Sequence, residues 1–105
     1  MAALRIEIDE TPGSAVVHLI GEFDMADERA FSTIVTDVVV SRVCPLVRLD
    51  CARLTFIDSL GLRGLIRAKK KGDALGVRLV ISGLQPSVRK VMEITDPVGW
   101  FEVES

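Results

Sequence analysis

The spacing between apolar residues changes along this chain, and that change limits the folds open to it. Leu4, Ile6 and Ile8 alternate with charged residues, which is the two-residue repeat of a strand with one solvated face. Beyond the turn residues 11–14, the apolar run 15–23 predicts a second strand that forms a hairpin with the first and is buried on both faces. From there the repeat lengthens to three or four residues, as in an amphipathic helix.

A first helix is predicted between this hairpin and Pro45, which would stop its continuation because proline has no backbone N–H group. Its apolar stripe consists of Ala26, Ala30, Phe31, Ile34, Val35, Val38 and Val39. The segment Leu46–Cys51 then predicts a short strand.

The later segments continue the alternation of helices and strands. They are predicted, in order, as a helix from Asp58-Ser59 to Gly72, a strand Val77–Ile81, a helix from Pro86 to Asp96-Pro97 with Val88, Val91 and Met92 buried, and a short strand with Trp100, Phe101 and Val103. Asp58 and Ser59 are both good capping residues, and the lysines 69–71 would lie at the negative end of the helix dipole.

This order predicts a single α/β domain over residues 1–105. Parallel neighbours need crossover connections, so we expect a mixed sheet of about four or five strands, with the N-terminal hairpin antiparallel and the rest mainly parallel, covered by about three or four helices. Apolar residues make up 49% of the chain and charged residues 27%, enough to fill a core and to cover it.

The charge, the hydrophobic pattern and the cysteine positions argue against several classes of function. The net charge of −2 gives no field that favours a polyanion, so direct binding to nucleic acid is not expected. Neither a leader segment nor a membrane span is recognised, so no membrane association is expected. Cys44 and Cys51 flank a predicted strand and would lie too far apart for a disulfide, which predicts reduced, buried thiols.

Catalytic and cofactor motifs are not found. Ser59 beside Asp58 is the best nucleophile candidate, but residues 57–61 lack the first glycine of a G-x-S-x-G elbow. The single histidine, His18, lies on a predicted strand and is expected to face polar surroundings. One histidine and two separated cysteines do not form a set of metal ligands. The sequence also contains no phosphate loop and no dinucleotide fingerprint. We therefore predict no cofactor and no enzyme activity.

Two loop ends carry the remaining unusual residues, at 21–24 and 58–62, and we expect them at the same edge of the sheet. Gly61 and Gly64 each cost a helix roughly 0.5–1 kcal/mol relative to alanine. Close approach of another backbone would explain them, and that backbone can belong to the chain's own sheet or to a partner.

The segments Gly21-Glu22-Phe23-Asp24 and Leu54–Leu62, with the strand and helix that follow, resemble the STAS domain of bacterial anti-sigma factor antagonists over nearly the whole chain. The resemblance implies a cytoplasmic protein whose unphosphorylated form binds an anti-sigma factor with serine kinase activity and frees a sigma factor. It also implies that phosphorylation of Ser59 abolishes binding and that a protein phosphatase restores it. The chain would then be a substrate and not an enzyme.

By motif position, the resemblance implies a partner-binding surface. Its residues are Asp24, Asp58, Ser59, Leu60, Gly61 and Arg63. Three of them have another reading: Ser59 as a plain helix cap, Asp24 as a cap with Asp27 in a capping box, and Arg63 as a solvated side chain. A phosphate on Ser59 would find exposed amides at the helix N-terminus.

Two departures from the family pattern bear on partner choice. Leu60 stands where many relatives carry a second small hydroxyl residue, and 96–99 replaces a glycine-ended helix exit. An alternative function is a STAS module that acts as a constitutive scaffold in a stress-sensing assembly and is not regulated at Ser59. Dependence of binding on phosphorylation would distinguish the two.

Overall fold

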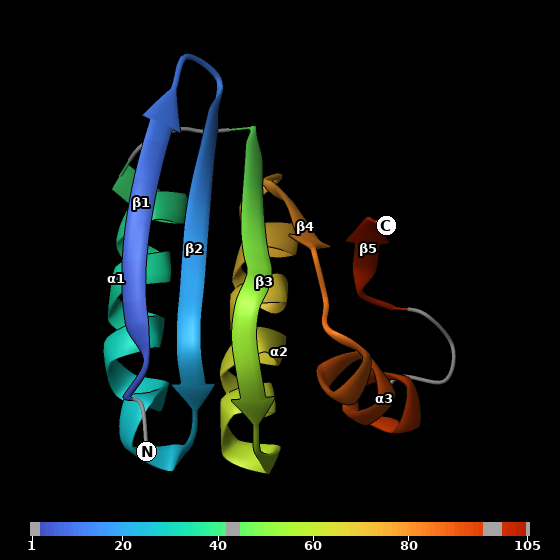
Figure 1. The fold of residues 1–105 in the computed structure, drawn as a ribbon. Helices are drawn as coiled ribbons and strands as arrows, with labels where there is room; N and C mark the ends of the chain where they lie inside the picture. Colours follow the sequence, from blue (N-terminus) through green and yellow to red (C-terminus); the bar gives the residue numbers. More distant parts are fainter. Residues whose placement is uncertain (1–2, 42–44, 96–99, 105) are drawn as a thin grey trace.

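The computed structural model describes residues 3–41, 45–95 and 100–104 of the chain. Its elements are β1 (Arg5–Thr11), β2 (Ser14–Phe23), the 3₁₀ turn η1 (Met25–Asp27), α1 (Glu28–Ser41), β3 (Leu46–Ile57), α2 (Ser59–Leu75), β4 (Arg78–Ser82), α3 (Pro86–Thr95) and β5 (Glu102–Glu104). The five strands form one sheet in the order β1-β2-β3-β4-β5 (Figure 1). Only β1 and β2 are antiparallel, which confirms the predicted α/β fold with a mixed sheet. Predictions for Cys44, Asp96-Pro97 and the side chain of Val39 lie outside the described residues.

Helices α1 and α2 pack on the same face of the sheet (Figure 1). Along β2, Ala15, Val17 and Leu19 are buried while the residues between them are only half-buried. The prediction that this strand is buried on both faces is therefore wrong, because the described helices cover one face. The largest fully buried side chains are Phe23, Phe31, Leu19, Leu49, Leu54, Leu65 and Ile81.

The opposite face of the sheet carries ion pairs between strands. Arg48 on β3 pairs with Glu104 on β5, with Nε 3.0 Å from Oε1, and Arg78 on β4 pairs with Glu102. Val80 lies beside Arg48 and Glu102 in the strand register and is buried, although it is not part of the main core. Long charged side chains thus cover apolar surface on this face with their aliphatic stems.

Strand β3 continues well past its predicted end at Cys51 and reaches Ile57. Its pairing with β4 stops at Asp50, but its pairing with β2 goes on to the partners Phe23 and Ile57, with two register shifts on the way. The distal half of β3 has exposed polar residues because it has only one neighbouring strand and an open face.

Helix α1 buries a narrower stripe than the sequence predicts. Phe31, Val35 and Val38 are in the core. Ala26 is exposed and lies in η1 rather than in the helix, and Ala30 is exposed on α1. The spacing of apolar residues predicted too wide a buried face for α1. The helix lies over the edge of the sheet formed by β1 and β2, and its other side faces solvent.

Helix α2 ends at Leu75 rather than at Gly72. The residue that terminates it is Gly76, which has a φ of 72° in the left-handed region. Gly72 stays inside the helix, where a Cβ atom would lie 3.0 Å from the carbonyl oxygen of Val77. That glycine therefore permits close packing and does not end the helix.

The lysines 69–71 accordingly precede the last turn of α2, and the predicted dipole role is wrong. Lys69 instead forms an ion pair with Asp73, with Nζ 3.0 Å from Oδ1, and lies 5.5 Å from the ring centroid of Trp100. The contact connects α2 to the segment before β5.

The C-terminal elements follow the predicted order. Pro86 is the first residue of α3, and Val88 and Met92 are buried as predicted, whereas Val91 is only half-buried. Strand β4 begins at Arg78, one residue after the predicted start. A last short strand is confirmed as β5, but Trp100 and Phe101, predicted to be part of it, precede it. Among the helices of the described ranges, none is long and apolar enough to cross a bilayer.

Candidate functional site

The two loop ends singled out in the sequence meet at the carboxyl edge of β2 and β3. Phe23 and Ile57 are partners in the parallel register, and the amide of Asp58 donates to the carbonyl oxygen of Phe23 at 3.2 Å. Asp24 and Asp58 follow directly on these strands. The prediction that both loops emerge at one sheet edge is confirmed.

Asp58 is the N-cap of α2, with extended backbone at φ −101° and ψ −178°. Its Oδ1 accepts hydrogen bonds from the amides of Leu60 at 3.0 Å and Gly61 at 2.8 Å. The amide of Leu62 donates to the Asp58 carbonyl oxygen at 2.9 Å. These bonds satisfy the first amides of the helix, which would otherwise have no partner.

The same carboxylate also binds the other loop. Oδ2 of Asp58 accepts a hydrogen bond from the amide of Met25 at 3.3 Å. Met25 is the first residue of η1, and its side chain is 66% exposed. One aspartate therefore fixes the start of α2 and the start of η1 with respect to each other.

Ser59 is the first residue of α2 and is exposed. The reading of Ser59 as the N-cap is wrong, because Asp58 performs that function. Within the part of the chain that the structure describes, the Ser59 hydroxyl makes no hydrogen bond. It stands free on a helix end whose position Asp58 fixes.

Asp24 has a capping role, as one of its two readings predicts. Its Oδ1 accepts from the amide of Ala26 at 2.9 Å, and Oδ2 of Asp27 accepts from the Asp24 amide at 3.4 Å. The backbone amide of Asp27 also donates to the Asp24 side chain, and with the bond from the Asp24 amide to Asp27 this forms a capping box. The box opens η1, which leads into α1, so it caps a 3₁₀ turn rather than α1 itself.

Gly61 and Gly64 face β2 of the same chain. A Cβ atom on Gly61 would lie 2.6 Å from the Phe23 carbonyl oxygen, and one on Gly64 would lie 3.1 Å from Cζ of the Phe23 ring. The close backbone predicted from these glycines is therefore the chain's own at Gly61, whereas Gly64 gives room to the Phe23 side chain. Leu60 is half-buried beside them.

Two arginines follow Ser59 on α2, and in the described part of the chain they differ in their partners. Nη1 of Arg67 lies 2.7 Å from Oε1 of Glu28 and so connects α2 to α1. Arg63 is exposed and forms no ion pair with any residue in the described ranges.

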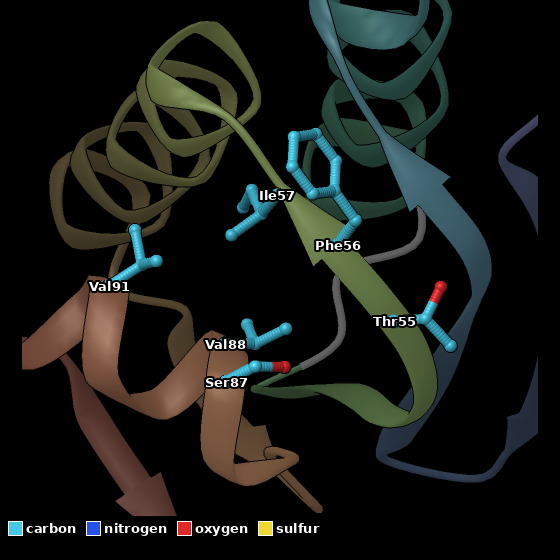
Figure 2. Close-up of a pocket in the computed structure, with 6 residues that line it drawn as sticks. All are labelled: Thr55, Phe56, Ile57, Ser87, Val88 and Val91. Carbon is cyan, nitrogen blue, oxygen red and sulfur yellow. The ribbon is translucent and has the colours of Figure 1, made fainter.

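A shallow groove of about 150 Å³ lies beside this edge, between the end of β3 and α3. It is lined by Thr55, Phe56, Ile57, Ser87, Val88 and Val91 (Figure 2). Phe56 is 47% exposed although it is a large apolar side chain. The sequence reasoning missed both the groove and this exposure. The signal was the adjacent pair Phe56-Ile57, because only one of two neighbouring strand residues can face the core.

His18 lies on the open face of the sheet between two carboxylates, which confirms the expected polar surroundings. Its Nδ1 is 2.7 Å from Oδ2 of Asp50, and its Nε2 is 2.8 Å from Oδ2 of Asp9. The hydrogen bonds to Asp50 and then to Asp9 raise the pKa of His18 above its ordinary value. Both ring nitrogens are thus engaged, and neither is available as a base for Ser59.

Cys51 is buried in β3, as predicted for this thiol, and burial raises its pKa to about 12. Across the described ranges, no three His, Cys, Asp or Glu side chains gather as metal ligands would.

Comparison with known structures finds the same fold in proteins that include an anti-sigma factor antagonist. An antagonist from Mycobacterium paratuberculosis superposes with a TM-score of 0.82 at 24% identity, covering 96% of this chain and 85% of that one. The Bacillus cell fate determinant SpoIIAA in its phosphorylated form gives 0.73 at 20% identity, covering 98% and 92%. RsbS from Moorella thermoacetica gives 0.77 at 17% identity, covering 95% and 86%.

At these identities the superpositions establish a common fold. The sequence itself matches the family model of the STAS domain over residues 5–104, which is almost its full length. The fold, the paired loops at the carboxyl edge of β2 and β3 and this match agree, and the chain belongs to the STAS domain family.

Proposed function

We propose that this protein is an anti-sigma factor antagonist regulated at Ser59. In this proposal the unphosphorylated form binds an anti-sigma factor that has serine kinase activity, and a sigma factor is released. The kinase transfers the γ-phosphoryl group of ATP to the Ser59 oxygen, which loses its proton, and ADP leaves. A protein phosphatase hydrolyses the ester and restores binding.

The observation that carries the proposal is the setting of Ser59. Its hydroxyl is exposed and has no hydrogen bond to residues 3–41, 45–95 or 100–104, so a kinase can reach it without opening the fold. The Asp58 bonds to both loops hold the surrounding backbone in place. A modification here changes the surface charge while the domain stays folded.

The surroundings of Ser59 support a protein partner. Two large apolar side chains, Met25 and Phe56, are exposed on the segments next to it. Apolar side chains close to a polar rim are typical of sites where proteins associate. We assign Asp24, Leu60 and Arg63 to the same partner surface. Gly61, which is buried against Phe23, shapes that surface through its backbone.

Electrostatics explains why phosphorylation would end binding. A phosphate adds about −1.5 to −2 charges next to the carboxylates of Asp58 and Asp24. A partner that covers Ser59 would have to desolvate this charge, at a cost of several kcal/mol. Each 1.4 kcal/mol is about a tenfold loss of affinity, so the complex would weaken by orders of magnitude.

The test is to capture partners with the wild type, Ser59→Ala, Ser59→Asp and a charge control. Thr36→Asp adds the same charge on the exposed surface of α1 and serves as that control. We expect the wild type, Ser59→Ala and Thr36→Asp to retain an ATP-binding protein that Ser59→Asp releases. Incubation of that complex with ATP should add one phosphate, which peptide mapping locates at Ser59.

Equal retention by all four proteins would instead support the constitutive scaffold. Phosphate incorporation at a residue other than Ser59 would move the switch elsewhere on the domain.

A further inference from the structure

Most of the backbone amides in the first turn of α2 already have hydrogen-bond acceptors and are not available to a phosphate. Oδ1 of Asp58 already accepts from the amides of Leu60 and Gly61, and the Leu62 amide donates to the Asp58 carbonyl. The expectation that exposed amides would receive a phosphate on Ser59 is therefore wrong for these three positions. With these three amides engaged, a cationic side chain is a stronger partner for a phosphate there.

Arg63 is placed to supply it. Residues four apart on a helix are neighbours on its surface, with Cβ atoms about 5–6 Å apart, and an acidic group N-terminal to a basic one is the favourable order. Ser59 and Arg63 have this spacing on α2, and both are exposed. Arg63 has no ion pair within the described ranges, whereas Arg67 is held by Glu28 at 2.7 Å.

We propose that Arg63 is the internal counter-ion of a phosphate carried by Ser59. The proposal rests on the proposed function for the existence of the phosphorylated state. Phosphorylation would then change the partner surface in two ways, because it adds negative charge at Ser59 and withdraws the guanidinium of Arg63 from the partner. Arginine suits this role because its planar group binds phosphate oxygens in pairs.

Other charged groups also act on this position. The carboxylates of Asp58, Asp24 and Asp27 belong to the two joined loops, and Glu28 begins α1 beside α2. All four disfavour the dianionic phosphate and raise its second pKa, which is ordinarily near 6. Glu28 is already paired with Arg67, and Arg63 opposes the other three, so its removal increases their net effect on the phosphate.

The test is a phosphorus NMR titration of the isolated protein with phosphoserine installed biosynthetically at position 59. We compare the wild type with Arg63→Gln, Arg63→Lys and the control Lys70→Gln, which removes one exposed cation further along the same helix. In Arg63→Gln the second pKa should rise by about half a pH unit, or about threefold in the dissociation constant. Arg63→Lys should recover part of the shift, and Lys70→Gln should leave the pKa within about 0.1 unit.

An unchanged pKa in Arg63→Gln would overturn the proposal, as would an equal rise in Lys70→Gln, which would indicate general charge rather than a pair. The titration needs no partner, so its result is independent of the proposed function. If phosphoserine at 59 leaves partner binding unchanged, the proposed function fails, whether or not the titration detects the pair.

Discussion

Asp58 and Met25 are separated by 33 positions in the sequence and joined by a hydrogen bond of 3.3 Å from the Met25 amide to Oδ2 of Asp58. This bond makes the two loops at the carboxyl edge one unit. The other oxygen of the same carboxylate caps α2. The two functions of Asp58 can be separated by substitution.

Asp58→Ala should lower the free energy of unfolding by about 1–2 kcal/mol, because both the helix cap and the link to η1 are lost. Asp58→Asn is the matched control. Asparagine caps helices as well as aspartate does, but its amide nitrogen cannot accept from Met25. Urea denaturation should show a loss below about 1 kcal/mol for Asn, while hydrogen exchange at the Met25 amide rises in both variants. Equal destabilisation by the two would mean that the link, and not the cap, carries the stability.

Gly61→Ala should be strongly destabilising, by about 2–3 kcal/mol, because the new methyl group would meet the Phe23 carbonyl oxygen at 2.6 Å. Gly64→Ala is the comparison within the same helix. Its methyl group would meet the end of the Phe23 ring at 3.1 Å, so the ring would have to move by only a few tenths of an ångström. The helical preference for alanine offsets part of that cost, so its change should stay within about 1 kcal/mol. Thermal or urea unfolding that ranked the two variants in the opposite order would contradict the packing described for this edge.

Ser59→Ala and Ser59→Asp should each change the free energy of unfolding by no more than about 0.5 kcal/mol. The Ser59 side chain is exposed and does not cap the helix. Aspartate in the first turn also interacts favourably with the helix dipole. Differences in binding between these variants can therefore be assigned to the surface. If urea denaturation showed that Ser59→Ala lowers the free energy of unfolding by more than about 1 kcal/mol, the serine would be contributing to the helix cap.

His18 should make stability depend on pH in a defined window. Its pKa is raised above the ordinary 6.5 by the hydrogen bonds to Asp50 and Asp9. A raised pKa contributes stability that is complete below pH 6.5 and is lost as the pH rises through the higher folded value.

The partner Asp50 sets the acid side of that window. Burial pushes its pKa up, but the amide of Ala52 and the ring of His18 together lower it below the ordinary 3.8. The corresponding stability is present above pH 3.8 and is lost as the pH falls through the lower folded value. Urea titrations should therefore place the highest stability between these limits. His18→Gln should lose about 1–2 kcal/mol near pH 6 and less above pH 8. A constant difference at all pH values would show that His18 is neutral in the folded protein.

The order of the elements was predictable because each depends on local spacing and on local stop signals. Pro86 begins a helix and the alternation at Leu4–Ile8 forms a strand in the context of this fold. The length of β3 was not predictable in the same way. Its distal half is held by pairing with β2 as far as Ile57, while one of its faces is solvated and its other edge is unpaired. The length of β3 is therefore determined by its pairing with β2 and not by the local sequence pattern.

The candidate site was located from its motif, but its internal bonds were not. The sequence placed two good caps side by side, and geometry assigned the cap to Asp58 and left Ser59 free. Nothing local indicates that the Asp58 carboxylate also reaches Met25, because that contact requires β2 and β3 to be in register. The groove beside Phe56 likewise depends on where α3 docks.

The strand order of the sheet, which is identical to the order along the chain, also has a consequence for how the protein is made. Each strand that leaves the ribosome can pair with the strand synthesised just before it, because a tight turn joins β1 to β2 and a helix lies in each later connection. No later segment has to insert between two strands that have already paired. The sheet can therefore grow from β1 by addition at one edge, in step with translation.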